Sequence, residues 1–318
     1  LQEYGWNEAG YDDENWKNVT IINENSRLVA QQMPPIEVTE ILKAKNISEP
    51  QPGVFVFDFG QNMVGRARLV VNGEAGQRIV MRFAELLHDD GTVAQENLRM
   101  AKATDTYILK GEGEEQWAPD FTYHGFRYVQ VEGLSGTPDQ STLKGEVFHT
   151  NVPFNGSFAC SNPLINKIWQ NITWGQRGNI MSVHTDCPQR DERLGWMGDA
   201  QIFAPTANYN MFMPSFWSKW EKDIIDCQEP EGWVYDVNPA IVVDGPSKPG
   251  WGDAAVIVPW QNYVFYGDTR ILEENYDGMK AWVDYMESES EDYIYEWGDT
   301  DWGGYGDWVA VVPSPTKP

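Results

Sequence analysis

The chain has 318 residues, which is enough for two domains, and 41% of them are hydrophobic, which suffices for a normal buried core. Its 48 acidic residues outnumber its 23 basic ones, and the net charge of −25 argues against nucleic acid or a polyanion as a partner. The longest apolar runs, such as AAVIVPW at 254–260, are too short to span a bilayer, so no membrane partner is expected.

Cysteine, histidine and aromatic content narrow the class of ligand. The three cysteines lie far apart without a CxxC pair and the four histidines are scattered singly, so neither a disulfide framework nor a metal site is expected. Fifteen Trp, 14 Tyr and 13 Phe make up 13% of the chain. Aromatic rings stack on the apolar faces of sugars, although a large core uses them too. Composition therefore favours carbohydrate binding and leaves a purely structural role open.

The first half of the chain has the sequence pattern of a β protein. Residues 1–35 carry no starting Met and no secretory signal, and we interpret them as the remnant of a preceding β-domain or a linker, cut from something longer. Residues 36–154 contain short runs that alternate apolar and polar side chains, such as GVFVFDFG, GRARLVVNG and QRIVMRFAE. Repeated strands separated by turn residues predict an antiparallel β-sandwich.

Residues 155–318 change to helical periodicity. The stretch SNPLINKIWQNITWGQRGNIM predicts a helix that Ser161 or Asn162 caps, with Pro163 in its first turn. Further helices are expected at about 198–212, 214–228, 253–266 and 269–287. The segment AAVIVPWQNYVFYG is apolar nearly all round, which predicts a helix buried between neighbours. The loops between these helices carry the unusual residues.

One of these loops, TDCPQRDERLGWMGD at 185–199, gathers acids, arginines and a tryptophan. Cleaving a glycosidic bond requires one carboxylic acid to protonate the leaving oxygen and a second carboxylate to attack the sugar or activate water. The loop supplies acids, cations that orient hydroxyls, and an aromatic wall: Asp186, Asp191, Glu192 and Asp199, Arg190 and Arg193, and Trp196. The alternative is a charged helix start, capped by Asp186 and entered at Pro188, with local ion pairs.

Two further loops repeat this combination of Trp, Asp and Gly. GPSKPGWGDAAV at 245–256 offers Trp251 and Asp253 just before a helix. EWGDTDWGGYGDWV at 296–309 offers Trp297, Trp302 and Trp308 together with four acids. Each loop alone could be a packed turn, but the three together indicate a pocket lined by Trp and acidic side chains.

These segments resemble a known family. DCPQRDERLGWMGDAQ resembles the signature of the bacterial α-L-rhamnosidases of glycoside hydrolase family 78, and GWGDAAVIVPW and YGDWVA resemble that family's next two segments in the same order. Upstream, FDFGQNMVGRARLVV, RFAELLHDDGTV and FTYHGFRYVQVEG resemble the β-sandwich that precedes its catalytic domain. The resemblance covers essentially the whole chain.

The resemblance implies an (α/α)6-barrel catalytic domain that releases terminal α-L-rhamnose with inversion, without a cofactor. It implies that Glu192 is the general acid. A rhamnose-containing glycoside or polysaccharide would be the partner, and its rhamnose would be held by Asp186, Arg190, Trp196, Asp199, Trp251 and Trp308, with Trp302 a weaker candidate. Rhamnose carries a methyl group at C6, so a Trp face beside it gains from burial while Asp and Arg bind the hydroxyls.

The resemblance also implies that the barrel is incomplete. Twelve helices are needed, whereas the chain offers about five before it ends at VVPSPTKP, and the family's general base would lie beyond residue 318. The acids Glu296, Asp299, Asp301 and Asp307 could lie near the pocket, but nothing marks one of them as a base. Such a half-barrel would expose an apolar face and favour self-association. A rhamnose-binding fragment without catalysis and a glycosidase for another sugar on the same barrel remain the alternatives.

Overall fold

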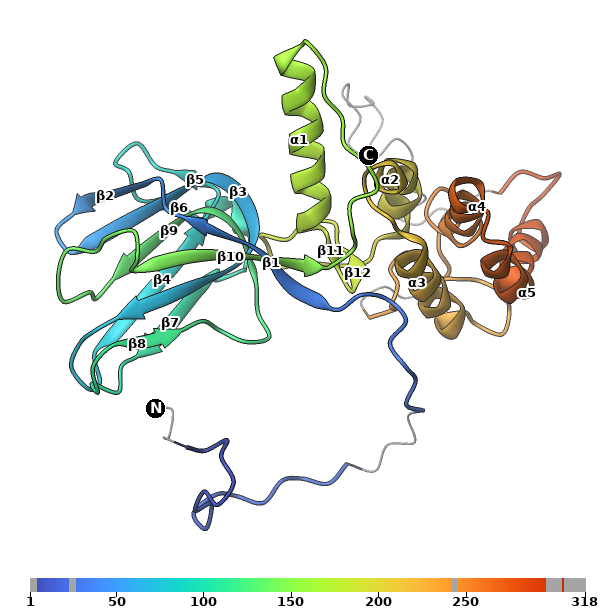
Figure 1. Cartoon of the computed structure of the whole chain (residues 1–318). Coiled ribbons are helices and arrows are strands. Elements are labelled where there is room, and N and C mark those ends of the chain that lie inside the picture. Colours follow the sequence, from blue (N-terminus) through green and yellow to red (C-terminus); the bar gives the residue numbers. More distant parts are fainter. Residues whose placement is uncertain (1–4, 23–26, 242–244, 296–304, 306–318) are drawn as a thin grey trace. The chain divides into compact units, whose positions relative to one another are not determined.

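The computed structural model describes residues 5–22, 27–241, 245–295 and 305 (Figure 1). The chain divides into two compact units. Unit 1 comprises residues 1–31, 38–148 and 189–191, and unit 2 comprises residues 32–37, 149–188 and 192–318. The domain limits inferred from the sequence, 1–35, 36–154 and 155–318, stay a prediction.

Unit 1 is built on an eight-stranded sheet. Six strands follow one another in the order β1 (Ile36–Lys43), β10 (Leu143–Thr150), β3 (Val54–Val71), β9 (His124–Glu132), β4 (Arg78–Ala84) and β7 (Thr104–Ile108). Off this path, β2 (Asn46–Gln51) and β8 (Glu115–Trp117) both pair with β3. A separate small ladder joins β5 (Leu86–Leu87) to β6 (Val93–Ala94), followed by a 3₁₀ turn at Glu96–Leu98.

The long strand β3 shows how these strands form one sheet. Its first part, Val54–Asp58, pairs with β2 and β9, and its later part pairs with β9 again at Met63–Gly65 and with β10 and β8. The register against β9 shifts between Asp58 and Met63, and an irregularity of this kind bends a strand and increases its twist. The antiparallel pairing predicted from the sequence is confirmed. Instead of two separate sheets, however, the hydrogen bonds run through one curled sheet.

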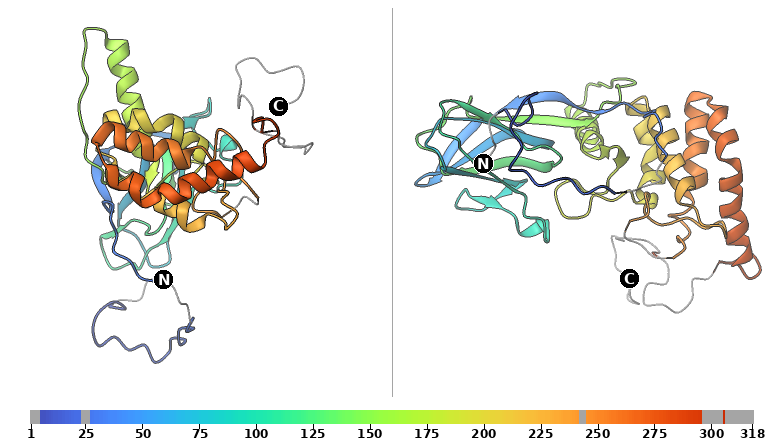
Figure 2. Two further views of the ribbon diagram at one scale, coloured as in Figure 1. Left: turned by 90° about the vertical axis from the view of Figure 1, so that its right-hand side faces the viewer. Right: turned by 90° about the horizontal axis from the view of Figure 1, so that it is seen from below.

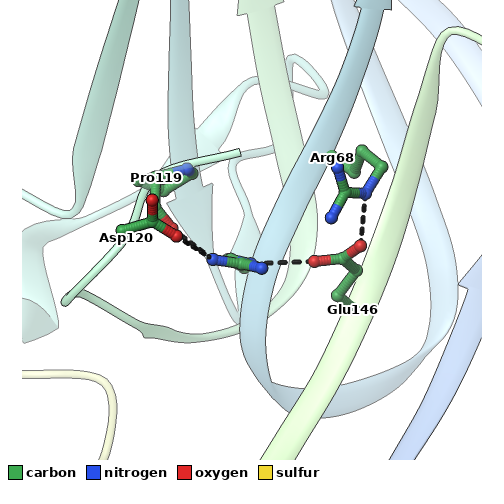
Figure 3. A network of polar contacts seen from close by, with 5 residues as sticks. Arg68, Pro119, Asp120 and Glu146 are labelled. Atoms are coloured by element: carbon green, nitrogen blue, oxygen red, sulfur yellow. Dashed lines mark hydrogen bonds and ion pairs between the residues drawn. The ribbon is translucent and has the colours of Figure 1, made fainter. Parts of the chain in front are cut away.

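An ion network centred on a buried glutamate ties β3 to β10 (Figure 3). Glu146 on β10 is 3% exposed and accepts hydrogen bonds from the guanidinium groups of Arg66 and Arg68 on β3. Arg66 also donates to the carbonyl of Pro119 at 2.7 Å and pairs with Asp120 at 3.0 Å. Burial opposes ionisation of Glu146, but the hydrogen bonds from Arg68 and Arg66 outweigh it and lower the pKa of this carboxyl.

Unit 2 contains five helices among its described residues. They are α1 (Pro163–Gly178), α2 (Met197–Asn210), α3 (Pro214–Cys227), α4 (Ala254–Tyr266) and α5 (Thr269–Ser288), with a short hairpin of β11 (Ile180–Met181) and β12 (Val183–His184) before α2. The five predicted helices are confirmed, and so is one predicted cap: the Asn162 side chain accepts from the backbone N–H of Leu164. No described helix has both the length and the apolar character that a membrane crossing requires.

The helices α2 to α5 pack around a core of large aromatic rings. Figure 2 shows α2 and α3 in yellow beside α4 and α5 in orange and red. Trp217 and Trp220 of α3 and Trp282 of α5 are almost completely buried in this core. The Trp217 indole donates to Asn208 of α2 at 2.8 Å, so even the polar edge of this ring is satisfied.

Not every apolar helix face is covered. On α4 one face is buried, but Ile257, Trp260 and Val264 on the other are 36%, 51% and 56% exposed, so the prediction of a helix buried all round was wrong for that side. No described residue range packs over it. Apolar residues on α1 and α2 are exposed as well: Leu164, Ile165, Ile168, Ile172, Ile202 and Tyr209.

Candidate active site

The acidic loop before α2 is closed by its own backbone and is not helical. Asp186 accepts from the N–H of Leu194 at 2.9 Å through its side chain, and its own N–H donates to the carbonyl of Leu194 at 3.2 Å. Helix α2 begins only at Met197, with Trp196 at the cap position and no side-chain cap. The alternative of a charged helix start capped by Asp186 and entered at Pro188 is therefore wrong. The acids lie on a loop, where side chains can face a ligand.

Glu192 sits in the middle of this loop and is half-buried. The indole N–H of Trp196 donates to Glu192 Oε1 at 3.1 Å, which fixes one carboxylate oxygen. The thiol of Cys187 lies 3.7 Å from Glu192 Oε2 and 2.6 Å from an oxygen of Asp186. Within the described chain, the ligand atoms of Asp186, Cys187 and Glu192 lie within 4.8 Å of one another. This spacing would fit a cation, but exposed acidic groups are commonly grouped in this way in proteins that bind no ion there.

Asp199, in the first turn of α2, belongs to the same electrostatic environment. Its side chain is open to a cavity, but the surrounding protein atoms partly desolvate the carboxyl and raise its pKa. The negative charges of Asp186 and Glu192 raise this pKa further. Three predicted carboxylates are therefore close enough to influence one another.

Trp251 reaches this site from a different loop, just before α4. Its ring lies against the first turn of α2, where a Cβ atom added to Gly198 would fall 2.6 Å from the indole. Its backbone N–H donates to the carbonyl of Lys248 at 2.9 Å. Gly198 of the GWMGD segment is therefore needed for the Trp251 ring to approach the helix.

A cavity of about 560 Å³ brings several of these residues together. Asp186, Asp199 and Trp251 line it, together with His184. Most of the other lining side chains are apolar and come from α1, α2 and α3, among them Ile172, Ile202, Phe203 and Trp217. Glu192 and Trp196 connect to this cavity through Cys187, Asp186 and the start of α2. Acids and a tryptophan around an apolar cavity match the chemistry of a sugar with one apolar face.

Two predicted site residues are not placed in this cluster. Arg190 is half-buried and belongs to the short segment 189–191 that packs with unit 1. Trp308 lies outside the described residues, as do Trp302 and the acids Glu296, Asp299, Asp301 and Asp307. Their part in a site stays a prediction.

Family models match both halves of the chain. The model for the bacterial alpha-L-rhamnosidase six-hairpin glycosidase domain matches residues 153–317, and the model for the bacterial alpha-L-rhamnosidase concanavalin-like domain matches residues 48–149. The chain belongs to the bacterial α-L-rhamnosidase family. Curated relatives agree: an alpha-L-rhamnosidase of Streptomyces avermitilis is 47% identical over 315 residues, and one of Formosa agariphila is 39% identical over 312 residues.

A solved rhamnosidase structure has the same fold over nearly the whole chain. The crystal structure of Streptomyces avermitilis alpha-L-rhamnosidase complexed with L-rhamnose superposes with a TM-score of 0.90 and covers 96% of this chain and 29% of that one. The two curated sequences cover 98% and 97% of this chain. The chain itself spans only 30% and 33% of the lengths of these two relatives.

The candidate site contains residues that the sequence patterns did not indicate. His184 is buried, and its Nε2 lies 2.7 Å from the carbonyl oxygen of Trp196; a carbonyl only accepts, so Nε2 carries the proton. Burial lowers the pKa of His184 to about 4, which keeps the ring neutral. Asp236, Lys248 and Tyr305 form a second missed group beside the tryptophans. A lone His or Asp between apolar residues carries no local signal of such contacts.

Proposed function

We propose that the protein hydrolyses terminal α-L-rhamnosyl units with inversion and that Glu192 is the general acid. The observation that carries this proposal is the position of Glu192. It is held by the Trp196 indole on the acidic loop, beside Asp186 and near a cavity lined by Asp199 and Trp251. Membership of the bacterial α-L-rhamnosidase family supplies the sugar and the bond that is cleaved.

Inversion requires two carboxyl groups with separate tasks. Glu192 would give its proton to the glycosidic oxygen as the bond to the anomeric carbon breaks. A general base would remove a proton from a water that attacks the same carbon from the opposite face. In inverting enzymes the two groups are about 6.5–9.5 Å apart, which leaves room for this water. We assign the base to none of the described residues.

The remaining predicted residues would hold the rhamnose. Hydroxyl groups would bind to Asp186, Arg190 and Asp199, because carboxylates accept and guanidinium groups donate hydrogen bonds. The indole faces of Trp196, Trp251 and Trp308 would form the walls, where the C6 methyl group gains from contact with an apolar ring. The cavity supports this division, since acids and Trp251 share it with apolar side chains.

We also propose that helices α1 to α5 are the first part of an (α/α)6 barrel. Two observations support this architecture. The matching family model describes a six-hairpin glycosidase domain, and the described helices leave apolar faces of α1, α2 and α4 uncovered. In a closed ring of helix pairs these faces would meet further helices.

The test is hydrolysis of a chromogenic aryl α-L-rhamnoside by the unaltered protein and by Glu192→Gln. Glu287→Gln, on the exposed surface of α5, is the matched control. We expect Glu192→Gln to lose at least about 100-fold in kcat, the contribution of a positioned general acid, and the control to keep full activity. NMR of the first product formed should show β-L-rhamnose. Equal turnover in Glu192→Gln would overturn the assignment, and rhamnose binding without turnover would favour a binding protein.

A further inference from the structure

Asp236 is a completely buried carboxylate in the loop between α3 and α4, and four donors surround it. Its Oδ1 accepts from the Ser247 hydroxyl at 2.6 Å and from the Lys248 backbone N–H at 3.0 Å. Its Oδ2 accepts from the Lys248 ammonium group at 3.2 Å and from the Tyr305 hydroxyl at 2.7 Å. A buried charge requires such compensation, because it has lost its contacts with water.

These bonds, together with those of the Asp236 backbone, connect residues that lie far apart in the sequence. Lys248 is 9% exposed and precedes Trp251, whose N–H donates to the Lys248 carbonyl at 2.9 Å. On the other side, the backbone carbonyl of Asp236 accepts from the N–H of Met197 at 2.8 Å, and Trp196 forms a β-bridge with the next residue, Val237. Asp236 is thus bonded to the segments that carry Trp196, Trp251 and Tyr305.

Among the aromatic side chains of these segments, Tyr305 contacts both Trp251 and Trp196. The Tyr305 ring lies 4.4 Å from the Trp251 ring and 6.4 Å, edge to face, from the Trp196 ring. The Lys248 ammonium group lies 4.7 Å from the centre of the Tyr305 ring, so a cation–π contact holds the ring as well. A change in the direction of Tyr305 would therefore move both tryptophans.

We propose that Asp236 is a positioning residue of the sugar site, which acts through Tyr305 to hold Trp196 and Trp251 in the orientation that binds the sugar ring. This inference rests on the proposed function, because Trp196 and Trp251 are its proposed sugar-binding walls. The hydrogen bond from the Tyr305 hydroxyl to Asp236 fixes the tyrosine ring, so Tyr305 itself need not touch the substrate. Aromatic walls bind a sugar in the ground state as well as in the transition state, so their misplacement should weaken binding more than it slows the chemical step.

Tyr305→Phe is the decisive variant, because it removes only the hydroxyl and leaves Asp236 bonded to Lys248 and Ser247. The chain offers a matched control in unit 1, where the Tyr107 hydroxyl donates to the Glu115 carboxylate at 2.6 Å. Tyr107→Phe therefore removes the same kind of bond far from any residue of the candidate site in sequence. Thermal unfolding of both variants measures the loss of stability that each substitution causes. Only Tyr305→Phe is expected to affect the sugar site as well.

The experiment measures the Kd of L-rhamnose by calorimetry, and kcat and KM for an aryl α-L-rhamnoside, with the protein at its full encoded length. We expect Tyr305→Phe to raise Kd and KM by about threefold to tenfold, with kcat within about twofold, since one hydrogen bond to a charged group is lost. Tyr107→Phe should leave all three constants unchanged. Asp236→Asn should weaken binding too, and the double variant should be no weaker than Asp236→Asn alone, because both act through one contact.

Each outcome has a separate meaning. Rhamnose binding that is unchanged in Tyr305→Phe overturns the inference and leaves the proposed function standing. Additive effects of Asp236→Asn and Tyr305→Phe also overturn it, because Asp236 would then act by another route. If the unaltered protein binds no rhamnose and cleaves no rhamnoside, the proposed function fails and the inference fails with it.

Discussion

At the scale of single residues, the candidate site depends on how closely side chains approach one another. The Trp196 indole is bonded to Glu192, the Trp196 carbonyl is bonded to His184, and the Trp251 ring rests on a glycine of α2. These contacts connect a neutral histidine, a candidate proton donor and an aromatic wall. Small changes at positions that never touch a ligand should therefore alter the site.

Gly198→Ala tests the closest of these approaches. The added methyl group would fall 2.6 Å from the Trp251 ring, so the ring must move. We expect a loss of about 1–3 kcal/mol in the free energy of unfolding, which is typical of overpacking, and weaker rhamnose binding. Gly175→Ala in α1 is the control, because its Cβ meets nothing within 4 Å and should stabilise the helix by about 0.5–1 kcal/mol. Equal effects of the two substitutions would contradict the prediction.

His184 predicts how the stability of unit 2 depends on pH. Its pKa is about 4 in the folded chain against 6.5 for an exposed ring, because burial penalises the charged form. The unfolded chain therefore binds more protons between these values, and stability that is present above pH 6.5 is lost as the pH falls to about 4. The whole effect is on the order of 3 kcal/mol.

Urea unfolding followed by Trp fluorescence across this pH range provides the measurement. His184→Gln should flatten the pH dependence, because the amide does not titrate. His88→Gln, which alters a histidine whose side chain is 43% exposed, is the control variant. An identical slope in His184→Gln and the unaltered protein would refute the assignment.

At the scale of elements, local patterns predicted the helices well and missed the bonds between them. The Asn162 cap, Pro163 in the first turn and the apolar spacing of α1 are all neighbours in sequence. The same holds for Pro214 in the first turn of α3 and for the Asp268 cap of α5. The irregular course of residues 185–195 could not be predicted, because Asp186 closes it through Leu194 rather than capping a helix. Asp236 and Tyr305 are 69 positions apart, and no periodicity connects such a pair.

The β3–β10 connection gives a prediction for the sheet. Glu146→Gln should destabilise unit 1 by about 2–3 kcal/mol, because it leaves Arg66 and Arg68 without their buried partner while Arg68 keeps partial access to water. The Glu146 pKa is lowered in the folded chain, so its contribution is present above about pH 4.5 and is lost as the pH falls further. Hydrogen exchange of the β3 and β10 amides measures the change.

The matched control is Glu132→Gln, which breaks the ion pair with Arg82 on the same sheet. Both of those side chains are about a third exposed, so less than about 1 kcal/mol should be lost. If both substitutions cost the same, the buried network would not contribute as we expect.

At the scale of the whole molecule, the exposed apolar faces dominate the expected behaviour in solution. Ile168 on α1 and Ile202 on α2 are 49% and 79% exposed. We expect the 318-residue chain on its own to self-associate in sedimentation velocity as its concentration rises, because association removes these side chains from water. Ile168→Lys together with Ile202→Lys should shift the chain towards the monomer.

Ile41→Lys on β1 is the control for this effect. Ile41 is 58% exposed in unit 1, so its substitution adds a charge of the same sign away from the helices, one instead of two, and should leave association unchanged. A chain that stays monomeric at every concentration would show that these apolar faces do not drive self-association in water.

The single carboxylate of Asp236 also constrains how this protein can vary. Because the buried charge of Asp236 is compensated by the Lys248 ammonium group, replacing either residue alone leaves an ammonium group or an acid without its counterpart. Viable substitutions should therefore occur in pairs, in which the acid and the lysine change together. Homologous chains should show covariation between these two positions, and an engineer who changes one of them would have to redesign both.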